Sequence, residues 1–366
     1  MGLKRQAIAI INHKDKPMIS GRSRYYSAAF VAAGSCFAAL MSGCSSDKKE
    51  DTASTATPGA SSPAPASKPF VVAYNQWIGY VAFFAALDKG YFKDAGLDVQ
   101  TKEFPGPADS VPVLMNGQID CSMTTVDTVI LLADKAKSNP ISMAYIIDTS
   151  NGADGVIAQK EIKTVADLRG KSVAATPGQC NELLLLKALE KAGMTEKDVK
   201  IVTMDADKGG AAVIAHQIPA AVTWEPSLTK AASAGGHVIF SSKDAPNILM
   251  DAITFTKSTL DTRGDDVRKF LDAYGKGEAF VKEHPDEAAQ IASKHFGTTP
   301  AESAAMLGKV LLYSPAENLT LVGTPDKTGT ALASAKEIGD FFVAQKQLAT
   351  VPDLSKLYTT DYLPKP

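Results

Sequence analysis

The sequence is poor in cysteine, tryptophan and histidine, and it contains neither a long hydrophobic run nor a basic cluster. Beyond the N-terminal region only Cys121 and Cys180 remain to pair, so the fold must depend on an apolar core. A formal net charge of −2 without a basic cluster argues against a nucleic-acid-binding protein. The scattered histidines lack metal-ligand spacing, and no phosphate loop or Ser/His/Asp order occurs, which argues against an enzyme.

The apolar run near the N-terminus, residues 28–40, is too short to cross a bilayer. It has about a dozen apolar residues where roughly 20 are needed. Arg22 and Arg24 precede it, and small residues ending at Cys44 follow, a pattern that is typical of an export signal. The end of the run resembles a lipoprotein signal, in which Cys44 receives lipid. We therefore expect residues 1–43 to be a signal peptide and the rest to lie outside the cytoplasm, anchored to a bacterial membrane.

Two details keep alternatives open. Met41 stands where the lipoprotein pattern usually has leucine, and Cys36 lies in a weaker competing context. An ordinary cleaved signal peptide and an uncleaved anchor are the alternatives to lipidation. Translation that begins at Met18 would give a more compact signal than translation from Met1.

Residues 44–69 comprise the predicted lipidated cysteine and a polar stretch rich in Ser, Thr, Ala and Pro. The stretch has no large apolar residue to drive collapse, so we expect a flexible tether. The roughly 300 residues that follow are at the upper limit for a single core, which favours two lobes.

The remaining chain alternates between short β-branched or apolar runs and segments with helical periodicity. From about residue 256 onward the pattern is mostly helical. We predict strands at residues 70–74, 97–103, 119–122, 141–148, 172–175, 200–204, 220–223 and 237–240, and helices at residues 81–89, 110–116, 126–135 and 181–192.

Such alternation predicts parallel sheets with ligands at the carboxyl ends of the strands. Four segments with suggestive polar or aromatic side chains follow predicted strands. They are residues 75–80, 124–127, 176–181 and 224–226. Each alone has an ordinary explanation, such as a core aromatic, a helix cap or a solvated carboxylate. Both tryptophans of the chain nevertheless fall directly after strands, one in each half.

These segments carry a family resemblance. The sequences QWIGY at 76–80, AALDKGYF at 85–92 and AGLDV at 95–99 resemble the opening of substrate-binding proteins of the nitrate, sulfonate, taurine and thiamine-precursor type. The similarity continues through LMNGQID at 114–120, TVADLRGK at 164–171 and AAVTWEP at 220–226. These proteins serve ABC importers.

The resemblance implies an α/β, bilobed periplasmic-binding-protein fold of type II. Two parallel-rich sheets flanked by helices would be joined by a two-strand hinge, with crossings near residues 149–155 and 249–253. Lobe 1 would hold residues 70–150 plus 252–366, and lobe 2 residues 151–251.

On this layout ligand-binding residues face a cleft from both lobes. Helix starts near Thr125 and Gln179 would suit anionic oxygens, whereas Glu225, and less strongly Asp205 or Asp127, would receive an amine. Glu225 has the alternative role of bracing the hinge. Cys180 is either a small polar contact or, with a lowered pKa, a reactive thiol. The expected binding residues are Gln76, Trp77, Tyr80, Thr124, Thr125, Asp127, Gln179, Cys180, Asn181, Trp224 and Glu225.

The function that follows is capture of a small nitrogen- or sulfur-containing solute for an ABC permease and its ATPase. The solute classes left open are sulfonates such as taurine, pyrimidines, amines or amides, and nitrate. The absence of histidine and lysine from the four segments weakens the case for an inorganic anion. We expect a monomer without a cofactor or metal. The alternatives are a ligand-sensing lipoprotein without transport and, less favoured, an enzyme of the same fold.

Overall fold

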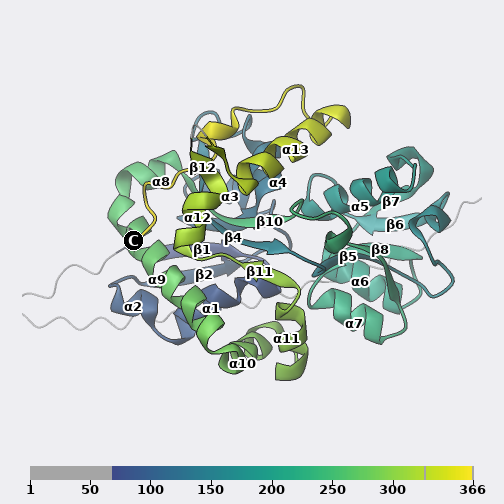
Figure 1. Ribbon diagram of the computed structural model, residues 1–366, viewed down its shortest axis with the longest axis horizontal. Coiled ribbons are helices and arrows are strands. Elements are labelled where there is room, and N and C mark those ends of the chain that lie inside the picture. Colours follow the sequence, from purple (N-terminus) through teal and green to yellow (C-terminus); the bar gives the residue numbers. More distant parts are fainter. Residues whose placement is uncertain (1–67, 325–326, 365–366) are drawn as a thin grey trace, which may run out of the picture. The chain divides into compact units, whose positions relative to one another are not determined.

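Two sheets dominate the computed structural model, which describes residues 68–324 and 327–364 (Figure 1). The predicted signal peptide, Cys44 and nearly all of the predicted tether lie outside these residues. No helix within the described ranges is both long and apolar enough to cross a membrane.

The first sheet has six strands in the order β11-β4-β10-β3-β1-β2. β1 runs parallel to β2 and β3, whereas β10 is antiparallel to both β3 and β4. The central strands are almost wholly buried, as expected for a sheet with both faces covered. Its strands are β1 (Phe70–Tyr74), β2 (Val99–Glu103), β3 (Cys121–Thr125), β4 (Ile141–Ser150), β10 (Met250–Thr256) and β11 (Val310–Leu312).

The second sheet has five strands in the order β7-β6-β8-β5-β9. β6 is parallel to β7 and β8, and β5 is antiparallel to β8 and β9. In Figure 1, α5 lies on one face of this sheet and α6 and α7 lie on the other. Its strands are β5 (Asp154–Ala158), β6 (Ser172–Ala175), β7 (Lys200–Thr203), β8 (Ala220–Trp224) and β9 (His237–Ser241).

Two short segments connect the sheets, and each sheet with its helices is called a lobe below. The chain leaves the first lobe after β4 and returns before β10. The segments are tied together, because Ser242 Oγ lies 2.8 Å from Ser150 Oγ and accepts a hydrogen bond from Gly152 N. Gly152 has φ of 104°, which favours glycine at this turn.

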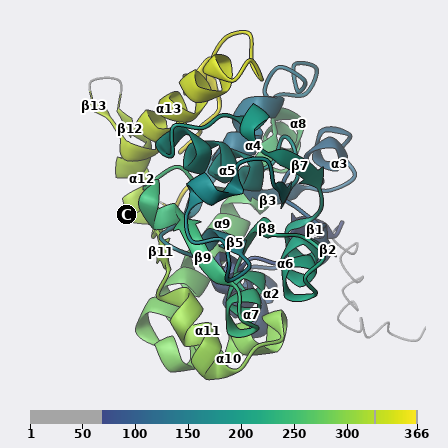
Figure 2. The same ribbon diagram turned by 90° about the vertical axis from the view of Figure 1, so that its right-hand side faces the viewer.

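The type II periplasmic-binding-protein fold is confirmed, with mixed sheets. Figure 2 shows the molecule from the side of the second lobe, with β5 and β9 toward the viewer. The prediction that the chain after residue 256 is mostly helical holds, except that β11 joins the first sheet. A small hairpin, β12 (Gly323–Thr324) with β13 (Lys327–Thr328), is a further exception. Strands β5 and β10 were not predicted, because both fall in or next to segments expected as crossings between the lobes.

The helices start and stop at ordinary local signals. Thr299 and Ser314 form capping boxes with Glu302 and Glu317, and Gly297 ends α10 in the left-handed region. The helices are α1 (Val81–Asp88), α2 (Tyr91–Asp94), α3 (Val111–Met115), α4 (Val126–Leu132), α5 (Cys180–Lys191), α6 (Ala206–Ile214), α7 (Ser227–Ser233), α8 (Lys257–Thr262), α9 (Gly264–Glu283), α10 (Pro285–Phe296), α11 (Pro300–Leu307), α12 (Pro315–Val322) and α13 (Thr330–Ala344).

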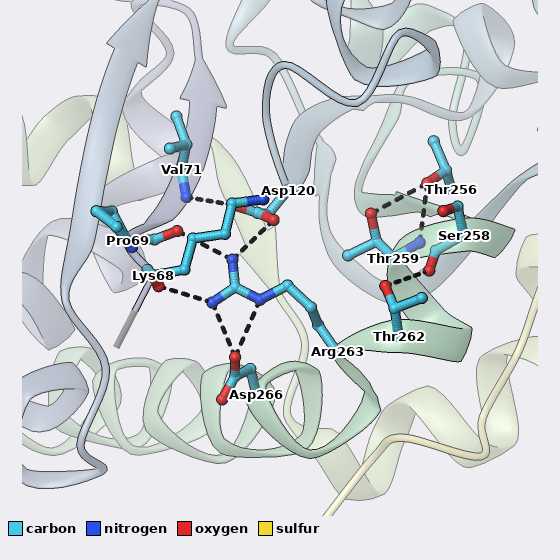
Figure 3. A network of polar contacts seen from close by, with 10 residues as sticks. All are labelled: Lys68, Pro69, Val71, Asp120, Thr256, Ser258, Thr259, Thr262, Arg263 and Asp266. Carbon is cyan, nitrogen blue, oxygen red and sulfur yellow. Dashed lines mark hydrogen bonds and ion pairs between the residues drawn. The ribbon is translucent and has the colours of Figure 1, made fainter. Parts of the chain in front are cut away.

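A buried arginine fixes the start of the first sheet to α9 (Figure 3). Arg263 Nη1 lies 2.8 Å from Asp120 Oδ1, and Arg263 Nη2 lies 2.8 Å from Asp266 Oδ2. The same guanidinium donates to the carbonyl oxygens of Lys68 and Pro69. A fully hydrogen-bonded ionic cluster therefore holds the N-terminal ends of β1 and β3 against the start of α9.

Candidate functional site

Strand register brings polar side chains together where the two sheets face each other. In the first lobe Asp251 pairs with Thr125 on one side and with Asp148 on the other. In the second lobe Asp154 pairs with Trp224. Backbone pairing therefore places two aspartates beside a threonine in the first lobe and a third aspartate beside an indole in the second.

Trp77 is anchored by Asp148. Its Nε1 donates to Asp148 Oδ2 at 3.0 Å, and both side chains are buried. A Cβ at position 79 would lie 2.1 Å from that carboxylate oxygen and 2.3 Å from Trp77 Nε1. Gly79 is therefore required for this contact. Burial raises the pKa of Asp148 to about 7, although the indole N–H opposes the shift.

Tyr80 is anchored in the same way by Asp251. Its hydroxyl donates to Asp251 Oδ1 at 2.8 Å and lies 3.4 Å from Asn75 Oδ1. Burial, followed by the neighbouring Asp148, raises the pKa of Asp251 well above its usual range. Tyr80 thus supports the cleft wall from behind.

The lobes meet at Trp224. Its Nε1, from the second lobe, donates to the carbonyl oxygen of Gln76 in the first lobe at 2.7 Å. Beneath this contact lies an inner cavity of about 10 Å³, enough for about one water molecule. A larger ligand therefore requires the walls to move apart. The cavity is lined by Asn75, Trp77, Pro107, Thr125, Asp154, Cys180, Trp224, Leu249 and Asp251.

Outside the Trp224 contact is a second cavity of about 330 Å³, which we call the outer cavity. Both lobes line it, and its ionisable side chains are three carboxylates and one lysine. Asp205, expected as a candidate amine acceptor, forms an ion pair with this lysine, Lys208. The lining residues are Gln76, Glu103, Phe104, Pro105, Asp205, Asp207, Lys208, Trp224 and Ser227.

The predicted residues around the start of α4 have different roles. Thr124 donates to the carbonyl oxygen of Pro107, and Thr125 donates to Thr128 Oγ1. Asp127 is completely buried, and neither carboxylate oxygen has a hydrogen-bond partner. Burial raises the pKa of Asp127 to about 6. A carboxylate at this helix start does not favour an anionic ligand.

The start of α5 also differs from the expected anion site. Gln179 reaches across to the first lobe, where its Nε2 donates to Asp109 Oδ2 at 3.3 Å. Asn181 Oδ1 accepts from Thr176 N and closes the turn. Cys180 lines the inner cavity, but burial, reinforced by nearby carboxylates, raises its pKa well above the usual range. A raised pKa disfavours a reactive thiolate at Cys180 and favours its role as a small polar contact.

Glu225 is engaged by protein groups. Its Oε1 lies 2.6 Å from Lys309 Nζ of the first lobe, and its two oxygens accept from Thr229 N and Oγ1. These contacts favour the bracing role, because they occupy the carboxylate and connect the lobes.

Three acidic residues of the cleft, Asp148, Asp154 and Asp251, were missed in the sequence. Burial raises the pKa of Asp154 to about 7, with Asp148, Glu225 and Asp127 contributing to the rise. The available signal was an aspartate inside an apolar strand, as in IID at 146–148 and MDAI at 250–253.

Comparison with known proteins identifies the family. Residues 77–288 match the model of the family described as NMT1/THI5 like. The chain belongs to the NMT1/THI5-like family. This match confirms the resemblance at family level, and it includes every predicted binding residue except Gln76.

Relatives of this NMT1/THI5-like chain include proteins named for binding. A Brucella abortus protein named only as a binding protein is 27% identical over 303 residues, which is 78% of this chain and 90% of its own. The formylaminopyrimidine-binding protein of Halalkalibacterium halodurans is 24% identical and covers 57% of this chain and 64% of its own. The periplasmic aliphatic sulphonate binding protein of Escherichia coli superimposes with a TM-score of 0.64 at 18% identity, covering 79% and 97% of the two chains.

One relative is an enzyme, the 4-amino-5-hydroxymethyl-2-methylpyrimidine phosphate synthase of Saccharomyces cerevisiae. It is 28% identical over 127 residues, which cover 34% of this chain and 36% of its own. Across the part of the chain that the structure describes, no three His, Cys, Asp or Glu side chains are placed to hold a metal ion.

Proposed function

We propose that this protein captures a small nitrogen- or sulfur-containing organic solute between its lobes and delivers it to an ABC permease and its ATPase. The observation that carries the proposal is the Trp224–Gln76 contact over a cavity lined by both lobes. A solute that contacts both lobes stabilises the closed form, and closure is the signal that a permease reads.

The names of the relatives support solute capture but differ in ligand. One relative is named for formylaminopyrimidine and one structure for aliphatic sulphonates. For this chain the range therefore includes sulfonates, pyrimidines, amines or amides, and nitrate.

Membrane attachment through Cys44 is part of the proposal. A lipid on Cys44 and the following polar tether would keep the lobes near the permease outside the cytoplasm. Cys44→Ser should move the protein from the membrane fraction to the soluble fraction on cell fractionation, while total protein stays constant. Continued membrane retention of this variant would contradict lipidation at Cys44.

Tryptophan fluorescence tests solute capture directly. The chain has two tryptophans, and both line the inner cavity. Titration of the full-length protein with sulfonates, nitrate, amines, amides and pyrimidines should give a large, saturable change for one class. Silence across the panel, with the protein shown to be folded, would contradict the proposal.

Transport and sensing are separated by an uptake assay. Cells that lack the protein should lose uptake of the solute identified by fluorescence, and restoring the gene should return it. Binding without any effect on uptake would favour a ligand sensor.

A further inference from the structure

Four aspartates lie at or close to the inner cavity, one in the second lobe and three in the first. Asp154 and Asp251 line the cavity, and Asp148 lies beside Asp251 in the strand register. Asp127 is the fourth, in the first turn of α4 and two residues after the cavity-lining Thr125. The exposed fractions are 0% for Asp127 and Asp148 and 6% for Asp154 and Asp251.

None of the four aspartates belongs to an ion pair among residues 68–324 and 327–364. Two lysines at the interface between the lobes already have carboxylate partners, Lys309 with Glu225 and Lys208 with Asp205. Both oxygens of Asp127 and Oδ1 of Asp148 also have no hydrogen-bond partner. The cluster is therefore acidic and electrostatically unbalanced.

Such an arrangement is costly to the fold. A buried carboxylate without a counter-charge or donor destabilises the folded state. Apolar residues at these buried positions would give a more stable fold. The raised pKa values of all four groups report this cost. Unbalanced groups of this kind cluster at functional sites, where a ligand supplies the missing partner.

We propose that the solute is a small organic cation with several N–H donors, such as an amidinium, a guanidinium or a primary ammonium. This inference rests on the proposed function and names the substrate class. The cationic group meets Asp154 and Asp251 at the cavity, with Asp127 and Asp148 adding negative potential behind them. The indoles of Trp77 and Trp224 pack against the cation or its flat apolar part.

Two other ligand classes fit less well. A sulfonate or nitrate would meet Asp154 and Asp251 in the inner cavity, and three further carboxylates, Glu103, Asp205 and Asp207, line the outer cavity. A bound metal ion would need convergent ligands, and the described residues offer no such group. Separated carboxylates instead suit the spread donors of an organic cation.

Probes of similar shape and different charge test the inference on the full-length protein. Acetamidine, acetamide and methanesulfonate form one set of similar shape, and benzamidine, benzamide and benzenesulfonate form a larger set. Binding is measured by tryptophan fluorescence and by isothermal titration calorimetry. We expect saturable binding of at least one amidine and at least tenfold weaker binding of its amide and sulfonate counterparts.

A variant pair locates the effect. Asp154→Asn should weaken amidine binding by roughly tenfold or more, because one facing charge is lost. Asp134→Asn, which removes an exposed surface charge of the first lobe, should change affinity less than about twofold. Amidine binding should also tighten from pH 6 to pH 8 as the aspartates lose protons, with proton release detected by calorimetry in two buffers.

The outcomes separate the two proposals. Saturable binding of a sulfonate or an amide without an amidine response overturns the cationic class and leaves solute capture standing. Equal losses in Asp154→Asn and Asp134→Asn overturn the placement of the cation. Silence of the folded protein toward every probe of these two sets overturns the cationic class, whereas the wider fluorescence panel of sulfonates, nitrate, amines, amides and pyrimidines decides the proposed function.

Discussion

The molecule contains two regions with buried aspartates, and they differ in whether the negative charge has a cationic partner. At the start of the first sheet, Asp120 forms an ion pair with Arg263. The guanidinium also donates hydrogen bonds to a second carboxylate and to two backbone carbonyl oxygens (Figure 3). At the cleft, four aspartates have no cationic partner among the described residues. The negative charge of the first region is balanced by an arginine of the chain. The negative charge of the second region is not balanced by any of the described residues.

This difference separates structural charge from functional charge. A buried ionic cluster whose hydrogen bonds are all made is compatible with a stable fold. Removing one of its partners destabilises the fold, because the other charge is then left buried and unpaired. An incomplete cluster reduces stability, and such local conflicts are expected at functional sites. Substitutions in the two regions should therefore act with opposite sign on stability.

The largest effect is expected at the complete cluster. Arg263→Ala leaves Asp120 buried without its cation and should lower the free energy of unfolding by about 3 kcal/mol. Urea denaturation measures the loss. Arg268→Ala, an exposed arginine of the same helix, is the control and should cost less than about 1 kcal/mol. Equal losses in both variants would mean that the cluster is not a structural ion site.

A smaller effect is expected at the ion pair between the lobes. Lys309→Met leaves Glu225 wholly buried, with the two Thr229 hydrogen bonds as its remaining support. Stability should fall by about 2 kcal/mol, because Lys309 itself is partly exposed. Lys336→Met, which removes an exposed i,i+4 partner, is the control. An unchanged unfolding midpoint in Lys309→Met would contradict the bracing role of Glu225.

The sequence predicted much of the fold because that part depends on local patterns. Apolar runs gave most strands of both sheets, and the resemblance gave the fold class. The sequence missed β5 and β10, since both were absorbed into the two predicted hinge crossings. The short Gly-containing run of β5, DGVIA, has little to distinguish it from a connection.

The site was less predictable because it depends on long-range register. Trp77, Thr125, Cys180 and Trp224 were expected at a cleft, and they line the inner cavity together. The contact of Asp251 with Asp148 required knowing that β10 pairs with β4, which lies far away in sequence. A local pattern also could not show that Lys309 forms an ion pair with Glu225, because the two residues are far apart in the sequence.

The pH dependence of stability distinguishes the two regions further. An unfolded aspartate has a pKa of about 3.9, and burial raises the pKa of Asp127 to about 6. Below about pH 4 both states hold the proton, so the shift carries no penalty. As pH rises through about 4 to 6 the unfolded chain loses the proton first, and the folded state becomes relatively less stable. The penalty is fully present above about pH 7.

Asp127→Asn should therefore stabilise the protein at pH 8 and not at pH 4. The expected gain at pH 8 is about 1 kcal/mol, smaller than the full penalty because the buried amide also lacks partners. Urea denaturation at the two pH values measures it, with Asp134→Asn as the surface control that should show no such difference. Because the same substitution removes negative potential behind the cavity, it should weaken amidine binding while strengthening the fold. A variant that loses stability at both pH values would show instead that Asp127 is a structural carboxylate, and the contrast between the two acidic regions would disappear.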